Sequence, residues 1–320
     1  MRAIVAEKHG GPEVLVPADL PEPVPGPGRL LVRVAAAGVN YIDTYHRTGR
    51  YETHPPFTPG VEIAGEVEAV GEGVTAFRPG DVVATADAVG GYAEKALVDE
   101  GRAVPVPADV DPEAAASVLL QGLTAHYLTH STYAVQPGDT VLVHAAAGGM
   151  GLLLTQLVKL LGGRVIGTVS TPRKERLARE AGAEEVVGYE DFARRVKDLT
   201  GGRGVPVVYD GVGAATFEGS LASLHPRGLL ALYGAASGPV PPFDPIRLAG
   251  LGSLFLTRPT LAHHVATTEE LRTRAEDVFG WLAAGRLNVH VGGRYPLSEA
   301  RRAHEDLEGR RTTGKLLLIP

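Results

Sequence analysis

Short apolar runs separated by glycine and proline fill the first third of the chain. They lie at residues 30–36, 62–70, 81–85 and 92–98. Short strand-like segments at this spacing are typical of a compact β-rich barrel. A proline-rich stretch at residues 21–28 precedes the first of them, and we interpret it as an ordered turn rather than a ligand for proline-binding modules.

From Pro112 onward the pattern changes to apolar strands that alternate with helical segments. Helical runs are expected at 114–120 and 123–133. Strands are then expected at 140–143, 164–169, 185–187, 205–210 and 229–233, with helices between them at 151–161, 173–181 and 192–199. This alternation predicts an α/β fold with a doubly wound parallel sheet. After about residue 260 we expect two more helices, 269–284 and 298–307, and a final strand, 315–319, that returns to the N-terminal unit.

A glycine-rich turn at residues 144–151, His-Ala-Ala-Ala-Gly-Gly-Met-Gly, is the most informative motif. It lies between a predicted strand and a predicted helix. Such a turn brings backbone N–H groups and the positive end of a helix to one point, where a pyrophosphate can bind. The spacing departs from Gly-x-Gly-x-x-Gly, and an ordinary turn is the alternative, but the flanking elements favour a dinucleotide site. The expected cofactor contacts are Ala147, Gly148, Gly149, Met150 and Gly151, with Gly148 and Gly149 permitting close approach and Gly151 permitting close helix packing.

The residues after the next strand favour NADPH over NADH. A site for NAD would carry Asp or Glu about 20 residues after the glycines. Here the segment reads Ser170-Thr171-Pro172-Arg173-Lys174, and the first carboxylate, Glu175, is expected inside a helix that begins at Pro172. Hydroxyls and cations suit a 2′-phosphate. The alternative is that these cations belong to a solvated first helical turn.

Composition narrows the possible functions. The chain has no cysteine, which excludes disulfides, thiolate zinc sites, iron–sulfur clusters and a cysteine nucleophile. The net charge is −6 and both signs are mixed along the chain, so no footprint for nucleic acid or an anionic membrane is present. No run reaches 18 apolar residues and the N-terminus lacks signal-peptide features. We expect a cytoplasmic protein that acts on a small molecule.

The histidines show no metal-binding spacing. His126, His144, His263 and His264 are not joined to carboxylates in a ligand pattern, and we expect them to be structural or exposed. No metal is therefore expected in the site.

Segments spread over nearly the whole chain carry a family resemblance. They lie at residues 9–15, 38–45, 60–71, 121–125, 144–151, 209–213, 252–259 and 310–315. Together they resemble the medium-chain dehydrogenase/reductase superfamily, and within it the zinc-free quinone oxidoreductases related to zeta-crystallin. The resemblance implies a GroES-like β-rich catalytic domain, residues 1–120 and 262–320, and a Rossmann nucleotide-binding domain, residues 121–261.

The zinc ligands of related alcohol dehydrogenases are replaced in this chain. Asn40 stands where those enzymes have a cysteine, and Val61 stands where they have a histidine. A site without a Lewis acid does not stabilise an alkoxide, so alcohol dehydrogenation is disfavoured. An acceptor that takes hydride directly is favoured instead.

The resemblance implies that NADPH reduces a quinone in the cleft between the two domains, while the protein positions the two rings and excludes water. An NADPH-dependent reductase of activated carbon–carbon double bonds is the alternative enzyme. A non-catalytic, crystallin-like NADPH-binding protein is the alternative outside catalysis. The resemblance also implies a homodimer, in which the apolar segment 252–256 would pair across a two-fold axis.

The same resemblance assigns roles to individual residues. Asn40 and Tyr45 are the catalytic candidates on the nicotinamide side; Tyr45 is either a proton donor or part of the lining, and Asp43 is structural. The remaining implied cofactor contacts are Thr124 for the nicotinamide or its phosphates, Ser170, Lys174 and Tyr189 for the 2′-phosphate and adenosine, Tyr233 for the nicotinamide ribose, and Arg310 over the cofactor. For Arg310 an ordinary surface arginine is the alternative.

Overall fold

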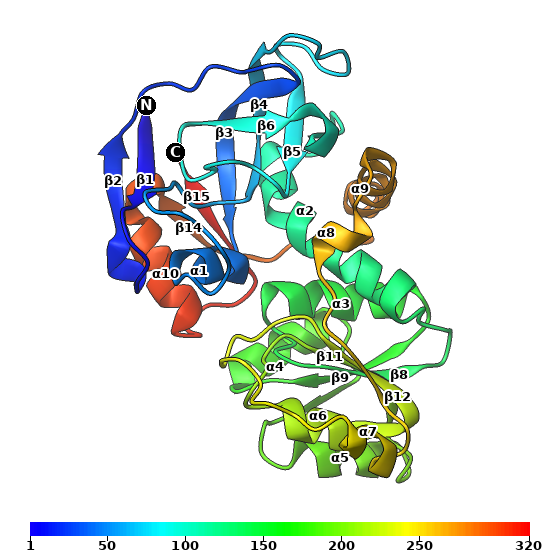
Figure 1. The fold of residues 1–320 in the computed structure, drawn as a ribbon. Helices are drawn as coiled ribbons and strands as arrows, with labels where there is room; N and C mark the ends of the chain where they lie inside the picture. Colours follow the sequence, from blue (N-terminus) through cyan, green and yellow to red (C-terminus); the bar gives the residue numbers. More distant parts are fainter. The chain divides into compact units, whose positions relative to one another are not determined.

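The two largest of the three sheets belong to different units of the chain (Figure 1). The computed structural model describes residues 1–320. Unit 1 contains Met1–Gly122 and Val265–Pro320, and unit 2 contains Leu123–His264. The predicted fold class, a β-rich unit followed by a parallel-sheet unit, is confirmed.

A seven-stranded sheet forms the centre of unit 1. Its order is β14-β15-β3-β4-β5-β7, and β6 also pairs with β3. The strands are β3 (Arg29–Val39), β4 (Glu62–Val70), β5 (Val82–Thr85), β6 (Lys95–Asp99), β7 (Val104–Pro105), β14 (Val291–Pro296) and β15 (Lys315–Ile319), and β1 (Arg2–Ala6) pairs separately with β2 (Leu15–Asp19). Alternate apolar residues of these strands, such as Leu30 and Val32 of β3, face one common core.

The last strand of the chain belongs to unit 1, as the sequence predicted, and it lies inside the seven-stranded sheet. β15 pairs with β14 on one side and antiparallel with β3 on the other, with Leu316 opposite Val39 and Leu318 opposite Ala37. The helices of unit 1 are α1 (Tyr41–Arg47), most of α2 (Pro112–Tyr127), α9 (Thr268–Ala283) and α10 (Ala300–Glu308).

Unit 2 contains a parallel six-stranded sheet in the order β10-β9-β8-β11-β12-β13. Its strands are β8 (Thr140–Val143), β9 (Arg164–Thr168), β10 (Glu185–Val187), β11 (Val205–Asp210), β12 (Leu224–Leu232) and β13 (Phe255–Thr257). Its helices are α3 (Gly149–Leu160), α4 (Pro172–Glu180), α5 (Phe192–Leu199), α6 (Phe217–Ser223), α7 (Ile246–Gly250) and α8 (Leu261–His264). In Figure 1, α3 lies over one face of this sheet, and α5 and α6 lie over the other.

The strand order of unit 2 reverses at β8. The chain proceeds from β8 to β9 and β10 on one side and then crosses to β11 on the other side. Ligands of open α/β sheets bind outside the carboxyl ends of the strands at such a switch point. The glycine-rich turn directly follows β8 and therefore lies at this point.

Three predicted boundaries were wrong. The two helices expected at 114–120 and 123–133 form one helix, α2, which continues into a π-helical turn at Leu128–Thr132. The helix after the glycine turn begins at Gly149 rather than at residue 151. In the segment 252–256, strand geometry begins only at Phe255.

The uninterrupted α2 has a packing explanation. Gly122 lies within it, and a Cβ at that position would approach Val278 Cγ1 to 2.7 Å. The glycine therefore serves close packing against α9 rather than a break in the helix. None of the helices combines the length and the apolar character that a membrane span requires.

Candidate active site

The glycine-rich turn has a left-handed residue at an unexpected place. Ala145 has a φ of +51°, a conformation that glycine usually adopts, whereas Gly148 has an extended conformation and caps α3. The Gly148 N–H donates to Ala145 O at 2.8 Å and closes the turn. In this turn the left-handed backbone conformation is thus adopted by an alanine and not by a glycine.

The start of α3 supplies the backbone donors of an anion site. Its first helical hydrogen bond runs from Leu152 N–H to Gly148 O at 2.9 Å, so the N–H groups of Gly149, Met150 and Gly151 precede the helical ladder. A Cβ on Gly151 would overlap Ala145 O and Ala146 Cα. Only glycine at position 151 lets α3 pack this close to the turn.

Ser170 and Lys174 lie together just beyond the carboxyl end of β9. Thr171 caps α4 by accepting the Lys174 N–H at 3.3 Å, and Pro172 occupies the first helical position. The Lys174 Nζ then lies 3.5 Å from Ser170 Oγ. An ammonium group and a hydroxyl group are thereby held at one point, as a phosphate-binding site requires.

The other predicted contacts of unit 2 lie near its strand ends. Tyr189 follows β10, is partly exposed, and its ring is nearly parallel to that of His144 at 6.3 Å. Tyr233 follows β12, with its ring against Gly211. Thr124 lies on α2 and is largely buried.

Asn40 caps α1 in unit 1, and its side chain is almost fully buried. Its Nδ2 donates to Glu62 Oε2 at 2.8 Å and to Gly38 O at 3.2 Å. Its Oδ1 accepts from Lys315 Nζ at 2.6 Å and from Gln121 Nε2 at 3.3 Å. These four bonds use both donors and both acceptor positions of the amide. A direct bond from this amide to a ligand requires one of them to open.

Lys315 and Glu62 form a buried ion pair beside Asn40. Lys315 Nζ lies 2.5 Å from Glu62 Oε2, and both side chains are at most 1% exposed. The second carboxylate oxygen of Glu62 accepts the Leu120 N–H at 2.7 Å. An ammonium group therefore lies among the residues that surround the replaced zinc-ligand positions. The sequence analysis missed Lys315 because a lysine at the start of an apolar strand is typically a solvated strand end.

A second chain of buried polar groups contacts α1 through Asp43 and Arg47. Asp43 Oδ2 accepts from the Asn40 N–H at 2.8 Å and from the Tyr92 hydroxyl at 2.9 Å. The Tyr92 oxygen lies 3.1 Å from His304 Nε2, and His304 Nδ1 lies 3.0 Å from Arg47 Nη1. Burial raises the pKa of Asp43 to about 6 and lowers the pKa of His304 to about 3, with the Arg47 charge also lowering the latter.

Tyr45 lies on α1, and Arg310 lies just after the end of α10. Tyr45 is 9% exposed, its ring meets the Tyr51 ring edge-on at 5.2 Å, and the Arg50 guanidinium lies 4.7 Å from its centroid. Arg310 follows α10 in a left-handed conformation. Burial raises the pKa of Tyr41, the first residue of α1, and the Arg310 charge opposes this shift. The Tyr41 hydroxyl donates to Leu307 O, near the end of α10, at 3.2 Å.

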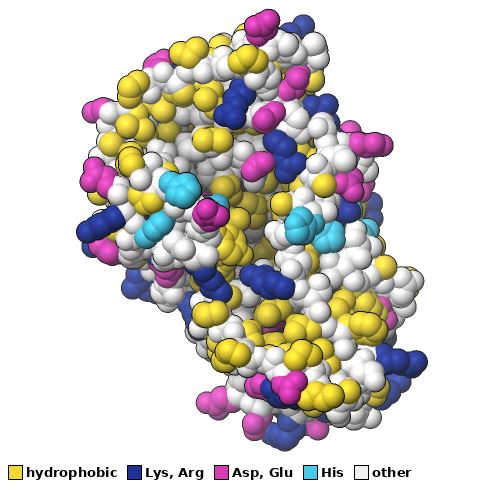
Figure 2. Space-filling model, in the orientation of Figure 1, with side chains coloured by type: hydrophobic (Ala, Val, Ile, Leu, Met, Phe, Trp, Pro, Cys, Tyr) yellow, Lys and Arg dark blue, Asp and Glu magenta, His cyan; other side chains and the backbone are white.

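The predicted site residues thus form one group in each unit. In unit 2, the glycine turn and the Ser170–Lys174 pair follow the neighbouring parallel strands β8 and β9. In unit 1, Asn40 and Tyr45 lie on α1, and Arg310 follows α10. Among the other histidines, His126 stacks on His130 at 4.2 Å and His264 on Tyr127 at 4.1 Å. No group of His, Asp or Glu side chains has the arrangement of a metal site. On the face shown in Figure 2, acidic and basic side chains are interspersed.

The chain is similar to known proteins over nearly its whole length. Residues 26–108 match the alcohol dehydrogenase GroES-like domain, and residues 149–279 match the zinc-binding dehydrogenase family. The chain is 48% identical to a quinone oxidoreductase of Pseudomonas aeruginosa, over 98% of this chain and 97% of that protein. This chain belongs to the quinone oxidoreductases of the medium-chain dehydrogenase/reductase superfamily. The family resemblance inferred from the sequence segments is confirmed, and the protein is an oxidoreductase of this superfamily.

Two further relatives bear on cofactor and substrate. A mycobacterial protein solved in complex with NADPH is 54% identical, with a TM-score of 0.98 over 100% of both chains. A 2-haloacrylate reductase of a Burkholderia species is 42% identical over 99% of this chain and 98% of that protein. The family therefore contains enzymes named for a quinone and enzymes named for an activated alkene.

Proposed function

We propose that this protein is a zinc-independent NADPH:quinone reductase. The observation that carries the proposal is the pairing of Lys174 Nζ with Ser170 Oγ beyond β9, next to a glycine turn and with no earlier carboxylate than Glu175. This arrangement suits a 2′-phosphate and lacks the acidic residue of an NAD site. The mycobacterial relative complexed with NADPH supports the cofactor, and the P. aeruginosa relative supports the quinone.

The residues present fit NADPH in two respects. The N–H groups at the start of α3 suit the pyrophosphate, and Ser170 and Lys174 suit the 2′-phosphate. The proposed contacts are Ala147, Gly148, Gly149, Met150, Gly151, Ser170, Lys174, Tyr189, Thr124 and Tyr233 from unit 2, with Asn40, Tyr45 and Arg310 from unit 1. NADPH supplies a hydride when it is bound.

The replaced zinc ligands favour an acceptor that takes hydride without a Lewis acid. Quinones are such acceptors. We assign Asn40 the additional task of fixing the start of α1, since its amide makes four hydrogen bonds within unit 1. A cofactor bond to this amide requires one of the four to open. Tyr45 is proposed to line the acceptor site, with its hydroxyl as the candidate proton donor.

The first test is a turnover assay. Purified protein is mixed with NADPH or NADH and with 1,4-benzoquinone, 9,10-phenanthrenequinone or 2-cyclohexenone, and cofactor absorbance is followed. We expect oxidation of NADPH with the quinones, slower oxidation of NADH, and little reaction with the enone. Reduction of the enone alone would replace the quinone proposal by the activated-alkene reductase, which the haloacrylate reductase relative favours. Binding without any turnover would support the non-catalytic alternative.

The role of Lys174 is tested by substitution. Lys174→Ala should raise the KM for NADPH about 10- to 100-fold, the loss expected for one charge-assisted contact with a phosphate, and leave the KM for NADH nearly unchanged. Arg176→Ala is the matched control, because it removes an exposed cation from the same helix. Equal effects of Lys174→Ala on both cofactors would contradict the assignment of the 2′-phosphate site.

A further inference from the structure

A fully buried polar chain lies under the glycine-rich turn of unit 2. It is centred on His144, the residue between β8 and the turn. His144 Nδ1 lies 3.0 Å from Thr168 Oγ1 at the end of β9, and His144 Nε2 lies 2.9 Å from Ser220 Oγ on α6. Ser220 Oγ donates to Asp210 Oδ2 at 2.7 Å. All four side chains are inaccessible to solvent.

The carboxylate fixes the direction of every bond in this chain. The Asp210 carboxylate can only accept, so the Ser220 hydroxyl donates its proton to it. The Ser220 oxygen must therefore accept the hydrogen bond from His144 Nε2–H. Burial lowers the pKa of His144 to about 4, so the neutral ring has a single N–H and its Nδ1 accepts. The Thr168 hydroxyl therefore donates to His144 Nδ1.

Thr168 connects this chain to the backbone of the turn. Because its proton is used on His144, Thr168 Oγ1 is an acceptor, and the Ala145 N–H donates to it at 3.2 Å. The Thr168 carbonyl oxygen accepts the next N–H, that of Ala146, at 3.0 Å. Thr168 thus holds two successive peptide groups of the turn, including the left-handed residue Ala145.

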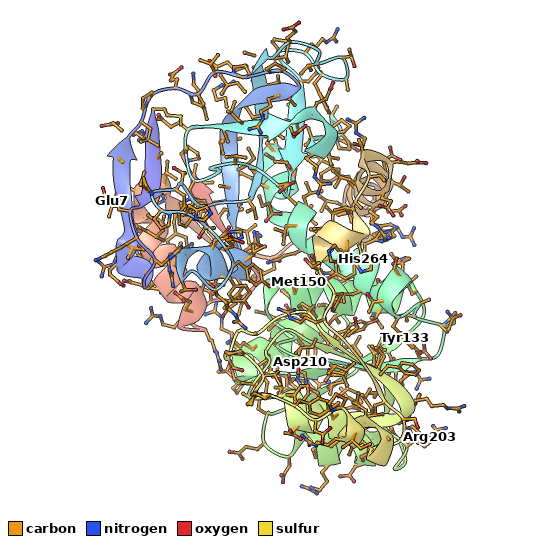
Figure 3. All side chains as sticks on the ribbon, viewed as in Figure 1. Glu7, Tyr133, Met150, Arg203, Asp210 and His264 are labelled. Carbon is orange, nitrogen blue, oxygen red and sulfur yellow. The ribbon has the colours of Figure 1, made fainter.

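The residue types are those of a hydrolytic triad, but the arrangement is different. In a triad the histidine lies between the serine and the carboxylate. Here the serine lies between the histidine and Asp210, and no member reaches solvent. The chain therefore has the geometry of a support for the backbone and not of a nucleophile. Figure 3 labels Asp210, the last residue of β11, and Met150, in the first turn of α3.

We propose that His144, Thr168 and Ser220 are positioning residues of the dinucleotide site, which transmit the fixed orientation of the Asp210 carboxylate to the backbone of Ala145. Asp210 itself is held by the N–H groups of Val212 and Gly213 and by the Thr216 hydroxyl. The left-handed conformation is disfavoured for alanine, so the turn depends on these contacts. The inference rests on the proposed binding of NADPH, and it assigns a function to residues that touch no ligand.

Equilibrium binding tests the proposal without turnover. Thr168→Val and Ser220→Ala remove single hydroxyls, and Thr168→Ser keeps the hydroxyl. The probes are NADPH, which contains the pyrophosphate, and 2′-AMP, which carries only the 2′-phosphate end. Ser223→Ala is the matched control, since Ser223 is also buried on α6 but donates to Gly219 O at 2.7 Å.

We expect Thr168→Val and Ser220→Ala to weaken NADPH binding about tenfold, the effect of one lost hydrogen bond, and 2′-AMP binding less than about twofold. Thr168→Ser and Ser223→Ala should retain the parent affinities. Unchanged NADPH affinity in Thr168→Val and Ser220→Ala overturns the proposal, and so does equal weakening of both probes. A parent protein that does not bind NADPH overturns the proposed cofactor and this inference together. A parent that binds NADPH without reducing quinones overturns only the proposed reaction.

Discussion

Lys315 is a cation in the interior of a β-rich unit, and its pairing with Glu62 determines what its loss would cost. Taking two charges out of water offsets most of their attraction, so the pair itself adds little stability. Removing one member leaves the other charge buried alone. We predict that Lys315→Met lowers the free energy of unfolding by about 3–5 kcal/mol, measured by chemical denaturation.

Two comparisons make this prediction specific. Lys95→Met removes a lysine whose partners, Glu22 and Glu68, are exposed, and should cost about 1 kcal/mol or less. The double variant Lys315→Met with Glu62→Gln should recover part of the loss, because no charge is then left unpaired. A Lys315→Met protein as stable as the Lys95→Met protein would refute this account.

Sequence reasoning identified residues whose partners are near in the chain. Ser170 and Lys174 are four residues apart, and the strand and helix around them were predictable, so their proximity was predictable too. Lys315 and Glu62 are 253 residues apart, and their meeting depends on β15 entering the sheet between β14 and β3. No local sequence pattern specifies which strands β15 pairs with. The sequence of the strand by itself predicts only an ordinary apolar strand.

At the scale of elements, His304 of α10 contacts Arg47 of α1 and so links the two helices. The unfolded chain binds a proton on this histidine near pH 6.5, whereas the folded protein does so only near pH 3. The unfolded state therefore binds more protons between these values, and stability falls as the pH is lowered through this range. His304 alone should remove about 2 kcal/mol between pH 7 and pH 5. Asp43 partly offsets this loss of stability. Its pKa is raised to about 6 in the folded protein, so the folded state binds a proton on Asp43 at a higher pH than the unfolded state does.

The measurement is the free energy of unfolding as a function of pH for the parent and for His304→Gln. Below pH 6.5, the free energy of unfolding of the variant should fall less steeply with decreasing pH than that of the parent. His54→Gln is the control, because His54 is almost fully exposed and should leave the pH dependence unchanged. Parallel curves for the parent and His304→Gln would show that His304 is not the titrating group.

Helices and strands with a regular apolar pattern were predicted well from the sequence. The features that were missed depend on packing between distant parts of the chain. The strand, turn and helix at residues 140–161 followed from apolar periodicity and glycines. The break expected near Gly122 did not occur, because its contact with Val278 comes from a helix more than 140 residues later in the chain. The left-handed conformation of Ala145 was equally hidden, since it depends on Thr168 rather than on the residue itself.

For the whole molecule, the homodimer implied by the family resemblance stays a prediction. Substitutions in strand β13 test it. This strand is the edge of the six-stranded sheet, and Phe255 on it is 61% exposed. Phe255→Arg should shift the protein from dimer to monomer in light scattering, since a charge in an apolar edge pairing is unfavourable. Val24→Arg, at an exposed valine of unit 1, should leave the mass unchanged. A monomeric parent protein would refute the prediction.

The position of β15 has a consequence for synthesis on the ribosome. Unit 2 is one continuous stretch, Leu123–His264, and all its strands are available as soon as that stretch has emerged. The sheet of unit 1 lacks the interior strand β15 until residues 315–319 have been translated, and until then Glu62 has no ammonium partner. Strands β3 to β6 are therefore translated before unit 2 but completed after it, so the growing chain carries an open edge of β3 while all of unit 2 is translated.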